Sequence, residues 1–178
     1  MGKIFLLIVG VLVIGVLVYL YYVGFFTKVT IEEKEMGPFV LVYEEHKGAY
    51  KNIGPVMDKV YNDLLADGVE TTRGMGIYYS DPKTTPEAEL RSVGGSIIED
   101  KDADKLPLLE KKYKMMRLEG KKYLVAEFPY KNSMSILAGV LRVYPQITKY
   151  VADHKYQTKE MIEIYDMPNG KIFYLMAL

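Results

Sequence analysis

The chain has 178 residues, with 23 basic and 23 acidic side chains, two His, no Cys and no Trp. This balance provides no basic surface for nucleic acid, so the composition argues against a DNA or RNA reader. Without Cys there is no disulfide framework, thiol nucleophile or thiolate metal site, and two His are too few for a His-rich metal site. Because 49% of the residues are hydrophobic and 26% are charged, the composition is that of a folded domain.

The first 26 residues indicate a membrane anchor. Residues Ile4 to Phe26 include no charge and no Pro, and as a helix they would reach about 34 Å, enough to cross a hydrocarbon core of about 30 Å. Tyr and Phe gather at the C-terminal end of this run, as in an interfacial aromatic belt. The alternative is a cleaved signal peptide, but Gly24 to Lys28 makes a poor cleavage site. We therefore expect residues 4–26 to contact a lipid bilayer.

Charges near the anchor give no clear orientation. Lys3 lies on one side, and Lys28 and Lys34 lie on the other, where neighbouring glutamates dilute them. The absence of Cys fits a reducing compartment. We expect a single-pass protein with its domain in the cytosol, in the ER membrane of a eukaryote or the inner or plasma membrane of a bacterium.

Residues 27–178 indicate two copies of one unit. Three segments recur in the same order with residues at matching offsets: Tyr50 to Asn52 with Tyr130 to Asn132, Pro55 to Asp63 with Pro145 to Asp153, and Tyr79 to Pro82 with Tyr165 to Pro168. Shared order favours duplication over chance. We predict repeat one at about 29–98, a linker at 99–111 whose charged part, 99–105, is a solvated loop, and repeat two at about 112–178.

Repeat one predicts two strands, a helix and two more strands. Residues 29–35 and 39–45 flank Gly37-Pro38 and favour a hairpin. A helix begins near Pro55, whose ring suits a first turn, and ends before Gly68, which suits a left-handed residue. Strands are predicted at 75–79 and 92–98.

Repeat two predicts the same order. Strands at 113–118 and 122–128 flank Glu119-Gly120, and a helix runs from about Ile136 to His154. Pro145 removes a backbone donor, so we expect a kink or two short helices there. Residues 161–165 and 171–175 flank Pro168-Asn169-Gly170 and favour a hairpin, because Asn-Gly accepts positive φ.

Two signatures in this pattern resemble a known family. One is His46 to Tyr50 (HKGAY), after the second strand, and the other is Ile162 to Pro168 (IEIYDMP). Together they resemble the GyrI-like, effector-binding family, which is related to SOUL domains. The resemblance implies an α+β fold, a duplicated β-β-α-β-β unit with pseudo-twofold symmetry and a groove between its halves, here preceded by one transmembrane helix.

A narrower resemblance is to animal ER-phagy receptors that place a GyrI-like domain directly after an N-terminal anchor. It is carried by Ile77 to Pro82, Arg91 to Ile97, Phe128 to Tyr130, Arg142 to Pro145 and Glu163 to Tyr165. Those receptors engage autophagy proteins through a long C-terminal tail, whereas the sequence given stops at Leu178. Tyr61 to Leu64 is a short aromatic-x-x-aliphatic match, but both ends lie on the apolar face of the predicted helix, so we interpret it as core. Membrane-anchored GyrI-like proteins of bacteria fit equally well.

Glu163 is the main candidate for binding. Strand alternation places Glu163 and Tyr165 on one face, and this face is the groove if Ile162 and Ile164 join the helix-backed core. The resemblance implies an acidic residue at this motif that meets cationic, aromatic-rich ligands. A carboxylate in a partly apolar pocket attracts a cation, and Tyr faces add ~0.5–2 kcal/mol. The alternative is an exposed Glu on an open sheet face.

Four other aromatic residues are candidate wall residues. Tyr79 matches Tyr165 in the repeat, whereas Tyr43, Phe128 and Tyr130 are weaker candidates, because a strand Tyr packs more often than it binds. His46 is expected to stabilise the turn at Gly48. Haem ligation by His46 or His154 is disfavoured, so we expect no cofactor and no metal.

The preferred hypothesis is a non-catalytic domain that binds a small hydrophobic or cationic molecule or a partner protein. The resemblance also implies an alternative, hydrolysis of cyclopropane-bearing reactive molecules with Glu163 as general base. Against it, the sequence specifies no second acid–base group, phosphate loop, nucleophile elbow or metal motif. An autophagy-type adaptor is the third hypothesis.

Overall fold

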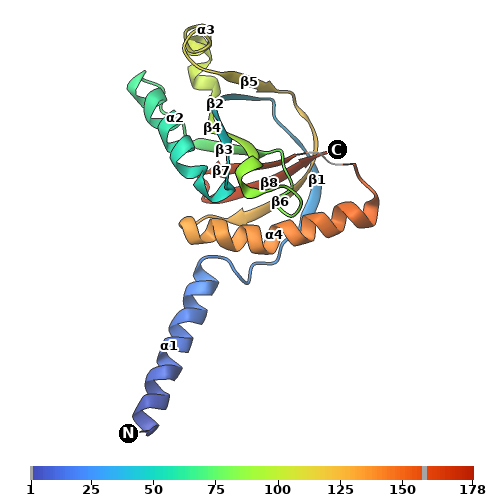
Figure 1. Cartoon of the computed structure of the whole chain (residues 1–178). Coiled ribbons are helices and arrows are strands. Elements are labelled where there is room, and N and C mark those ends of the chain that lie inside the picture. Colours follow the sequence, from blue (N-terminus) through green and yellow to red (C-terminus); the bar gives the residue numbers. More distant parts are fainter. Residues whose placement is uncertain (1, 158–159) are drawn as a thin grey trace.

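The structure, a computed structural model, describes residues 2–157 and 160–178. Helix α1 (Gly2–Tyr22) projects from an α+β domain (Figure 1). Among the described residues, α1 is the one helix long and apolar enough to cross a membrane, and a signal sequence near an N-terminus meets the same criteria. Its end differs from the expected anchor boundary at Phe26, because the chain leaves the helix at Tyr22 and Val23 is already buried against the domain.

The domain contains eight strands and three α-helices among the described residues. The strands are β1 (Ile31–Met36), β2 (Phe39–Lys47), β3 (Arg73–Tyr78), β4 (Arg91–Ile97), β5 (Met115–Leu118), β6 (Lys121–Pro129), β7 (Met161–Asp166) and β8 (Lys171–Ala177). The helices are α2 (Gly54–Ala66), α3 (Leu106–Leu109) and α4 (Ser133–His154), with short 3-10 turns η1 (Tyr50–Asn52), η2 (Glu87–Glu89) and η3 (Asp100–Lys105). The order of strands and long helices agrees with the sequence prediction.

Local signals explain the ends of the two long helices. Pro55 lies in the first turn of α2, and Gly68 follows its end with φ of 77°. Asn132 caps α4, because its side chain accepts a hydrogen bond from the Met134 amide at 2.9 Å. Of the two alternatives expected at Pro145, a kink or two short helices, the second is wrong: α4 is one helix of 22 residues that contains Pro145.

Strand pairing contradicts both hairpins expected at the start of the repeats. The eight strands form one antiparallel sheet in the order β1-β6-β8-β7-β3-β4-β2-β5. Strand β1 therefore pairs with β6 and β5 with β2, rather than each with the strand that follows it in the chain. The β7–β8 hairpin is confirmed, with Gly170 at φ of 58° in its turn. When the labels β1–β4 are exchanged with β5–β8 in order, the same strand order results, read from the opposite edge of the sheet.

The curled sheet has two different faces (Figure 1). Helices α2 and α4 pack on one face, and their side chains join two clusters of buried residues around Phe128 and Leu64. The other face carries a cluster made only of strand residues, including Leu41, Met75 and Ile164. The space between α2 and α4 therefore lies above the middle of the sheet, where β3 pairs with β7.

The segment 99–111 is more ordered than the solvated linker that its charge suggested. It forms η3 and α3, and Leu109 is 2% exposed in the cluster around Leu64. The carboxylate of Asp102 is buried and pairs with Lys105 at 2.7 Å. Charge composition was misleading because the apolar residues Leu106 and Leu109 fix the segment to the domain.

Candidate functional site

A cavity of about 1180 Å³ lies between α2 and α4, with β3 and β7 at its floor. Its lining combines apolar side chains and the charged residues Lys51, Asp58, Arg73 and Glu87 with six tyrosines: Tyr50, Tyr61, Tyr78, Tyr130, Tyr144 and Tyr165. Such a lining suits an apolar or aromatic ligand of drug size. Both helices and both central strands contribute, so the fold itself forms the cavity.

Glycines lower the floor of this cavity. A Cβ on Gly74 would lie 2.8 Å from the Met57 side chain of α2, and a Cβ on Gly76 would lie 2.9 Å from the Tyr78 hydroxyl. Real Cβ atoms do not come this close. The missing side chains therefore allow Tyr78 to lie across β3 toward β7, where Glu163 is paired with Gly76.

Glu163 is the acidic side chain at the base of the cavity, and it is 2% exposed. Three tyrosine hydroxyls surround its carboxylate. Tyr144 of α4 donates to Oε1 at 2.6 Å, Tyr165 donates to Oε2, and Tyr78 reaches Oε2 at 3.4 Å. These donors come from α4, β7 and β3, so the tertiary fold assembles the group.

Burial controls the ionisation of this cluster. Desolvation raises the pKa of Glu163 above its ordinary value, and the hydrogen bonds from Tyr144, Tyr165 and Tyr78 lower it in part. Burial also raises the pKa of Tyr144 and Tyr165, and the negative charge of Glu163 adds to this. The tyrosines therefore remain neutral donors at physiological pH, and the carboxylate is the titrating group of the cluster.

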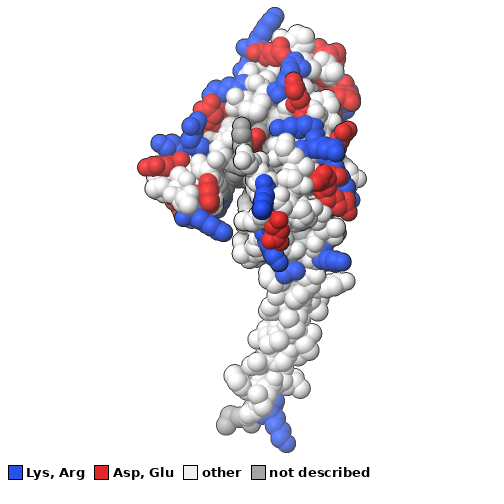
Figure 2. Space-filling model, turned by 90° about the vertical axis from the view of Figure 1, so that its right-hand side faces the viewer, with Lys and Arg blue, Asp and Glu red and all other residues white. Residues whose placement is uncertain are grey.

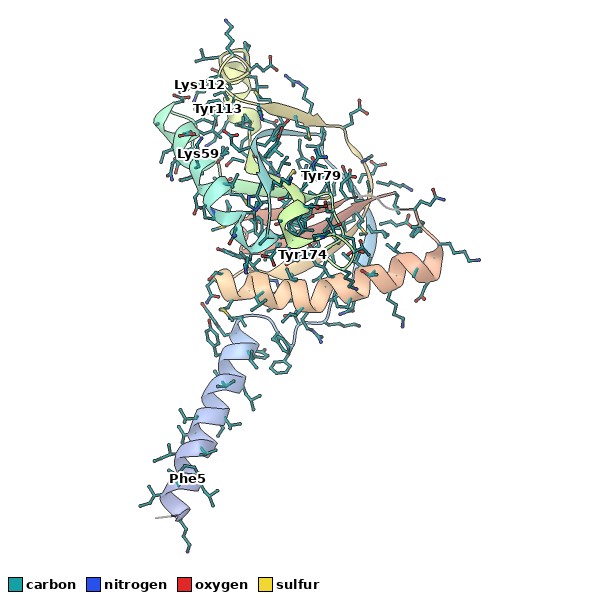
Figure 3. The ribbon with its side chains drawn as sticks, in the orientation of Figure 1. Phe5, Lys59, Tyr79, Lys112, Tyr113 and Tyr174 are labelled. Carbon is teal, nitrogen blue, oxygen red and sulfur yellow. The ribbon has the colours of Figure 1, made fainter. Side chains whose placement is uncertain are left out.

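Further aromatic rings hold the donors in place. Tyr78 packs edge-on against Tyr50 at 4.9 Å between ring centroids, and Tyr144 packs edge-on against Tyr174 at 5.8 Å. The Tyr50 hydroxyl also donates to the Ser80 carbonyl at 2.8 Å. Tyr174 is fully buried between the sheet and α4, where its hydroxyl lies beside Gly139 (Figure 3).

The structure brings three of the six predicted binding residues to the cavity: Glu163, Tyr165 and Tyr130 all line it. Tyr43 lies on the opposite face of the sheet, partly buried against the strand-only core. Phe128 is 1% exposed in the core beneath α4. The predicted wall positions of Tyr43 and Phe128 are therefore wrong, because both side chains pack within the domain.

Tyr79 was also predicted to be a wall residue, and this prediction is wrong. It is 44% exposed, does not line the cavity, and lies well apart from Lys59 of α2 in Figure 3. Its neighbour Tyr78 points to the cavity instead. Matching Tyr79 to Tyr165 was a slip of one residue, and such a slip moves a strand side chain to the other face.

The condition that Ile162 and Ile164 join the helix-backed core is not met. Both side chains lie in the strand-only core rather than beneath the helices. Alternation still places Glu163 on the opposite face, and this is the face that carries the helices and the cavity.

Sequence reasoning missed Tyr144 and Tyr78. Tyr144 stands just before Pro145 in α4, and no spacing rule linked it to Glu163. The available signal for Tyr78 was the Tyr78-Tyr79 pair, in which alternation allows only one ring to face the cavity. His46 matches its expectation, because its ring bonds with the Ala49 carbonyl at 3.1 Å beside Gly48, whose φ is 121°.

The fold and its cavity are those of a small-molecule-binding domain. Residues 27–171 match the GyrI-like small molecule binding domain family, and the chain belongs to this family. It is similar to the testis-expressed protein 264 homolog of Mus musculus, with 26% identity over 165 residues that cover 88% of this chain and 51% of the relative. It is also similar to testis-expressed protein 264 of Homo sapiens, with 25% identity, 70% of this chain and 40% of the relative. The chain thus spans about half the length of the curated relatives it matches.

Solved structures share the fold at low identity. The structure of SAV2435 bound to tetraphenylphosphonium has a TM-score of 0.54 at 13% identity, covering 83% of this chain and 93% of that one. The EcmrR C-terminal domain has a TM-score of 0.56 at 8% identity, covering 84% and 96%. An integron cassette protein of Vibrio cholerae has a TM-score of 0.51 at 13% identity, covering 83% and 94%. These structures establish the fold of the domain.

Proposed function

We propose that this protein is a membrane-anchored binding protein for hydrophobic cations, which enter the cavity between α2 and α4. The observation that carries the proposal is the buried carboxylate of Glu163 at the base of an apolar, tyrosine-lined cavity. A buried carboxylate without a cationic partner is costly, and a bound cation offsets this cost. The tyrosine rings add cation–π attraction.

The comparisons support the chemical class of this ligand. The chain belongs to a small-molecule-binding family, and SAV2435, which shares the fold, is bound to tetraphenylphosphonium. Tetraphenylphosphonium is an aromatic cation with no proton to donate. In this chain, such a ligand would interact with Glu163 by charge and with the tyrosine rings by their faces.

We extend the proposal to the origin and anchoring of the chain. The palindromic strand order supports a duplicated β-β-α-β-β unit, with repeats at about 29–98 and 112–178. Helix α1 has the length and apolarity of a membrane span, and we propose that it holds the domain on the cytosolic side. Figure 2 shows charges of both signs spread over the domain, whereas the column of α1 carries a basic group only near its tip.

An adaptor role in ER-phagy, implied by the narrower resemblance, needs a different recognition surface from Tyr61 to Leu64. Leu64 is 0% exposed in the core beneath α2, whereas Tyr61 lines the cavity. Binding a partner through both side chains would require α2 to leave the sheet. Small-molecule binding therefore has the stronger support.

Titration of the full chain in detergent micelles with tetraphenylphosphonium tests the proposal. We expect saturable binding that quenches tyrosine fluorescence and weakens about tenfold or more in Glu163→Gln, which corresponds to about 1.4 kcal/mol. Glu35→Gln is the matched control, because Glu35 is exposed on β1 and does not line the cavity. Equal affinity of the Glu163→Gln variant and the parent would refute a charge-based site.

Turnover of a cyclopropane-bearing alkylator, lost in Glu163→Gln, would instead support the hydrolase.

A further inference from the structure

We propose that the N-terminal half of α4 rests on the surface of the bilayer that α1 enters, so that the cavity opens at the membrane. The inference rests on the proposed anchoring of α1. The partner that covers this part of α4 is the lipid surface itself. The ligand that enters the cavity from this surface is a hydrophobic molecule dissolved in lipid.

The N-terminal half of α4 carries an unusual exposed apolar face. Met134, Leu137 and Leu141 follow a helical spacing and are 43%, 49% and 56% exposed, and Val140 beside them is 36% exposed. Beyond the segment that ends at Phe26, these four are among only nine large apolar side chains exposed in the described residues. A contiguous apolar patch of this kind marks an interaction surface.

The connection from α1 holds this face close to the membrane. Val23 is 1% exposed, and Phe25 packs on the cluster that contains Ala138 and Val143 of α4. The guanidinium of Arg142 lies 5.9 Å from the centre of the Phe25 ring. Because the chain docks on the domain immediately after α1, the domain has no long tether that would let it float away from the bilayer.

The orientation of the helices agrees with this contact. Figure 1 shows α4 lying across the end of α1, with its N-terminal half above the point where α1 stops. A helix that lies across a membrane span runs along the membrane surface, where an amphipathic helix buries its apolar face among the headgroups. The apolar patch of α4 is therefore placed for the headgroup region.

Charges around α4 favour an anionic lipid surface. The helix carries Arg142 and Lys149 against a single acid, Asp153. Exposed Lys28 and Lys131 flank it in the connection and before its first turn. Basic residues close to an anionic leaflet are attracted to its negative surface potential.

The same face forms the rim of the cavity. Leu137 and Val140 are exposed and also line the cavity, as does Met167 in the β7–β8 turn, which is 53% exposed. At this end Gly24 packs against Pro129, and the next residue, Tyr130, lines the cavity. A ligand in the headgroup region would thus reach Glu163 without crossing bulk water.

The absence of Cys makes a direct test simple, because one introduced Cys takes a unique label. Leu141→Cys and Leu108→Cys would carry a fluorophore in the full chain, in vesicles of phosphatidylcholine and phosphatidylserine. Leu108 is 68% exposed on α3, at the end of the domain far from α1 (Figure 1), and is the matched control. We expect lipid-borne quenchers to quench the Leu141 label several-fold more than the Leu108 label, and aqueous iodide to show the reverse order.

A third label at Leu12 in α1 separates this inference from the anchoring proposal. If the Leu12 label is in lipid while iodide reaches Leu141 and Leu108 alike, membrane docking of α4 is wrong and the anchor stands. If iodide reaches Leu12 as well, the anchoring proposal fails and the docking fails with it. A Leu141 label shielded from both quenchers would mean that a second copy covers the face, which also overturns the inference.

Charge variants provide an independent measurement. Neither Met134 nor Leu141 lines the cavity, and both are exposed, so Met134→Glu/Leu141→Glu is expected to fold and to bind tetraphenylphosphonium in micelles as the parent does. In vesicles it should increase iodide quenching of a label at Thr148→Cys, an exposed position farther along α4, several-fold. Unchanged quenching at Thr148 would show that these apolar side chains do not hold α4 on the membrane.

Discussion

At the scale of single residues, burial of the ionised Glu163 carboxylate lowers the stability of the folded protein. Its carboxylate is buried at the base of the cavity and accepts hydrogen bonds from Tyr hydroxyls. Among the described residues it forms no hydrogen bond with a Lys or Arg. Buried carboxylates of this kind are typical of sites rather than of structural cores. Comparison of the parent with Glu163 variants should therefore reveal the contribution of this group to the pH dependence of folding and of binding.

Glu163→Gln should stabilise the protein increasingly as the pH rises. Burial raises the pKa of Glu163 above 4.5, so the folded chain holds its proton more tightly than the unfolded chain. The parent therefore loses stability as the pH increases from 4.5 through the raised pKa, and a neutral Gln does not. Thermal unfolding of both proteins in micelles across this interval measures the difference, and a constant difference at all pH values would contradict the raised pKa.

Tyr144→Phe should move the pH dependence of cation binding to higher pH. The Tyr144 hydroxyl donates to Oε1 at 2.6 Å and lowers the pKa of Glu163, so removing it raises that pKa further. Since only the ionised carboxylate attracts the cation, tetraphenylphosphonium affinity should increase with pH in both proteins. The midpoint of this increase should lie at higher pH in the variant. Tyr79→Phe, outside the cavity, should leave the midpoint unchanged. A midpoint that moves to lower pH would show that Tyr144 does not stabilise the carboxylate.

At the scale of elements, the exchange of edge strands links the two halves of the sheet. Strand β1 pairs with β6 and β5 with β2, so each half is completed by a strand from the other. At the centre of the sheet, β3 pairs with β7, and this places Tyr78 within reach of Glu163. The donors of the site therefore depend on pairing that is remote in sequence.

A disulfide can distinguish this pairing from a local hairpin. Glu35 on β1 and Lys122 on β6 are directly paired and both exposed, so Glu35→Cys/Lys122→Cys should cross-link on oxidation. Glu35→Cys/Val40→Cys joins positions that a hairpin across Gly37-Pro38 would bring together, and it should remain reduced. Electrophoretic mobility without reductant, with peptide mass spectrometry, identifies the linked pair. Cross-linking of the second pair alone would favour the hairpin.

Local chemistry predicted the ends of α2 and the turn between β7 and β8, but not which strands pair. Gly68 and Gly170 lie at backbone positions with positive φ, and such signals act over a few residues. The choice between β2 and β6 as the partner of β1 depends on contacts across the whole domain. The candidate site divides in the same way: alternation predicted the face of Glu163, whereas Tyr144 comes from a helix whose position over β7 only the tertiary fold defines.

At the scale of the whole molecule, the docked connection after α1 joins this helix closely to the domain. Gly24 has φ of 89°, and a Cβ there would lie 2.5 Å from Pro129 and 3.2 Å from the Phe128 ring. Backbone conformation and space both require glycine at this point. The orientation of the cavity relative to α1, and so to a membrane if α1 spans one as proposed, therefore depends on this contact.

Gly24→Ala should release the domain from α1 while leaving its core folded. A left-handed Ala costs roughly 1–2 kcal/mol, and the clash with Pro129 adds to this, so residues 23–29 should leave the surface of the domain. Trypsin should then cleave after exposed Lys28 several-fold faster, whereas cleavage after Lys155, at the far end of α4, should keep its rate and serve as the internal control. Tetraphenylphosphonium affinity in micelles should remain unchanged, because the hydrogen bonds to Glu163 come from Tyr78, Tyr144 and Tyr165 and not from this segment. Faster cleavage at both lysines would mean that the domain has loosened as a whole, and equal cleavage in variant and parent would show that the connection is already free.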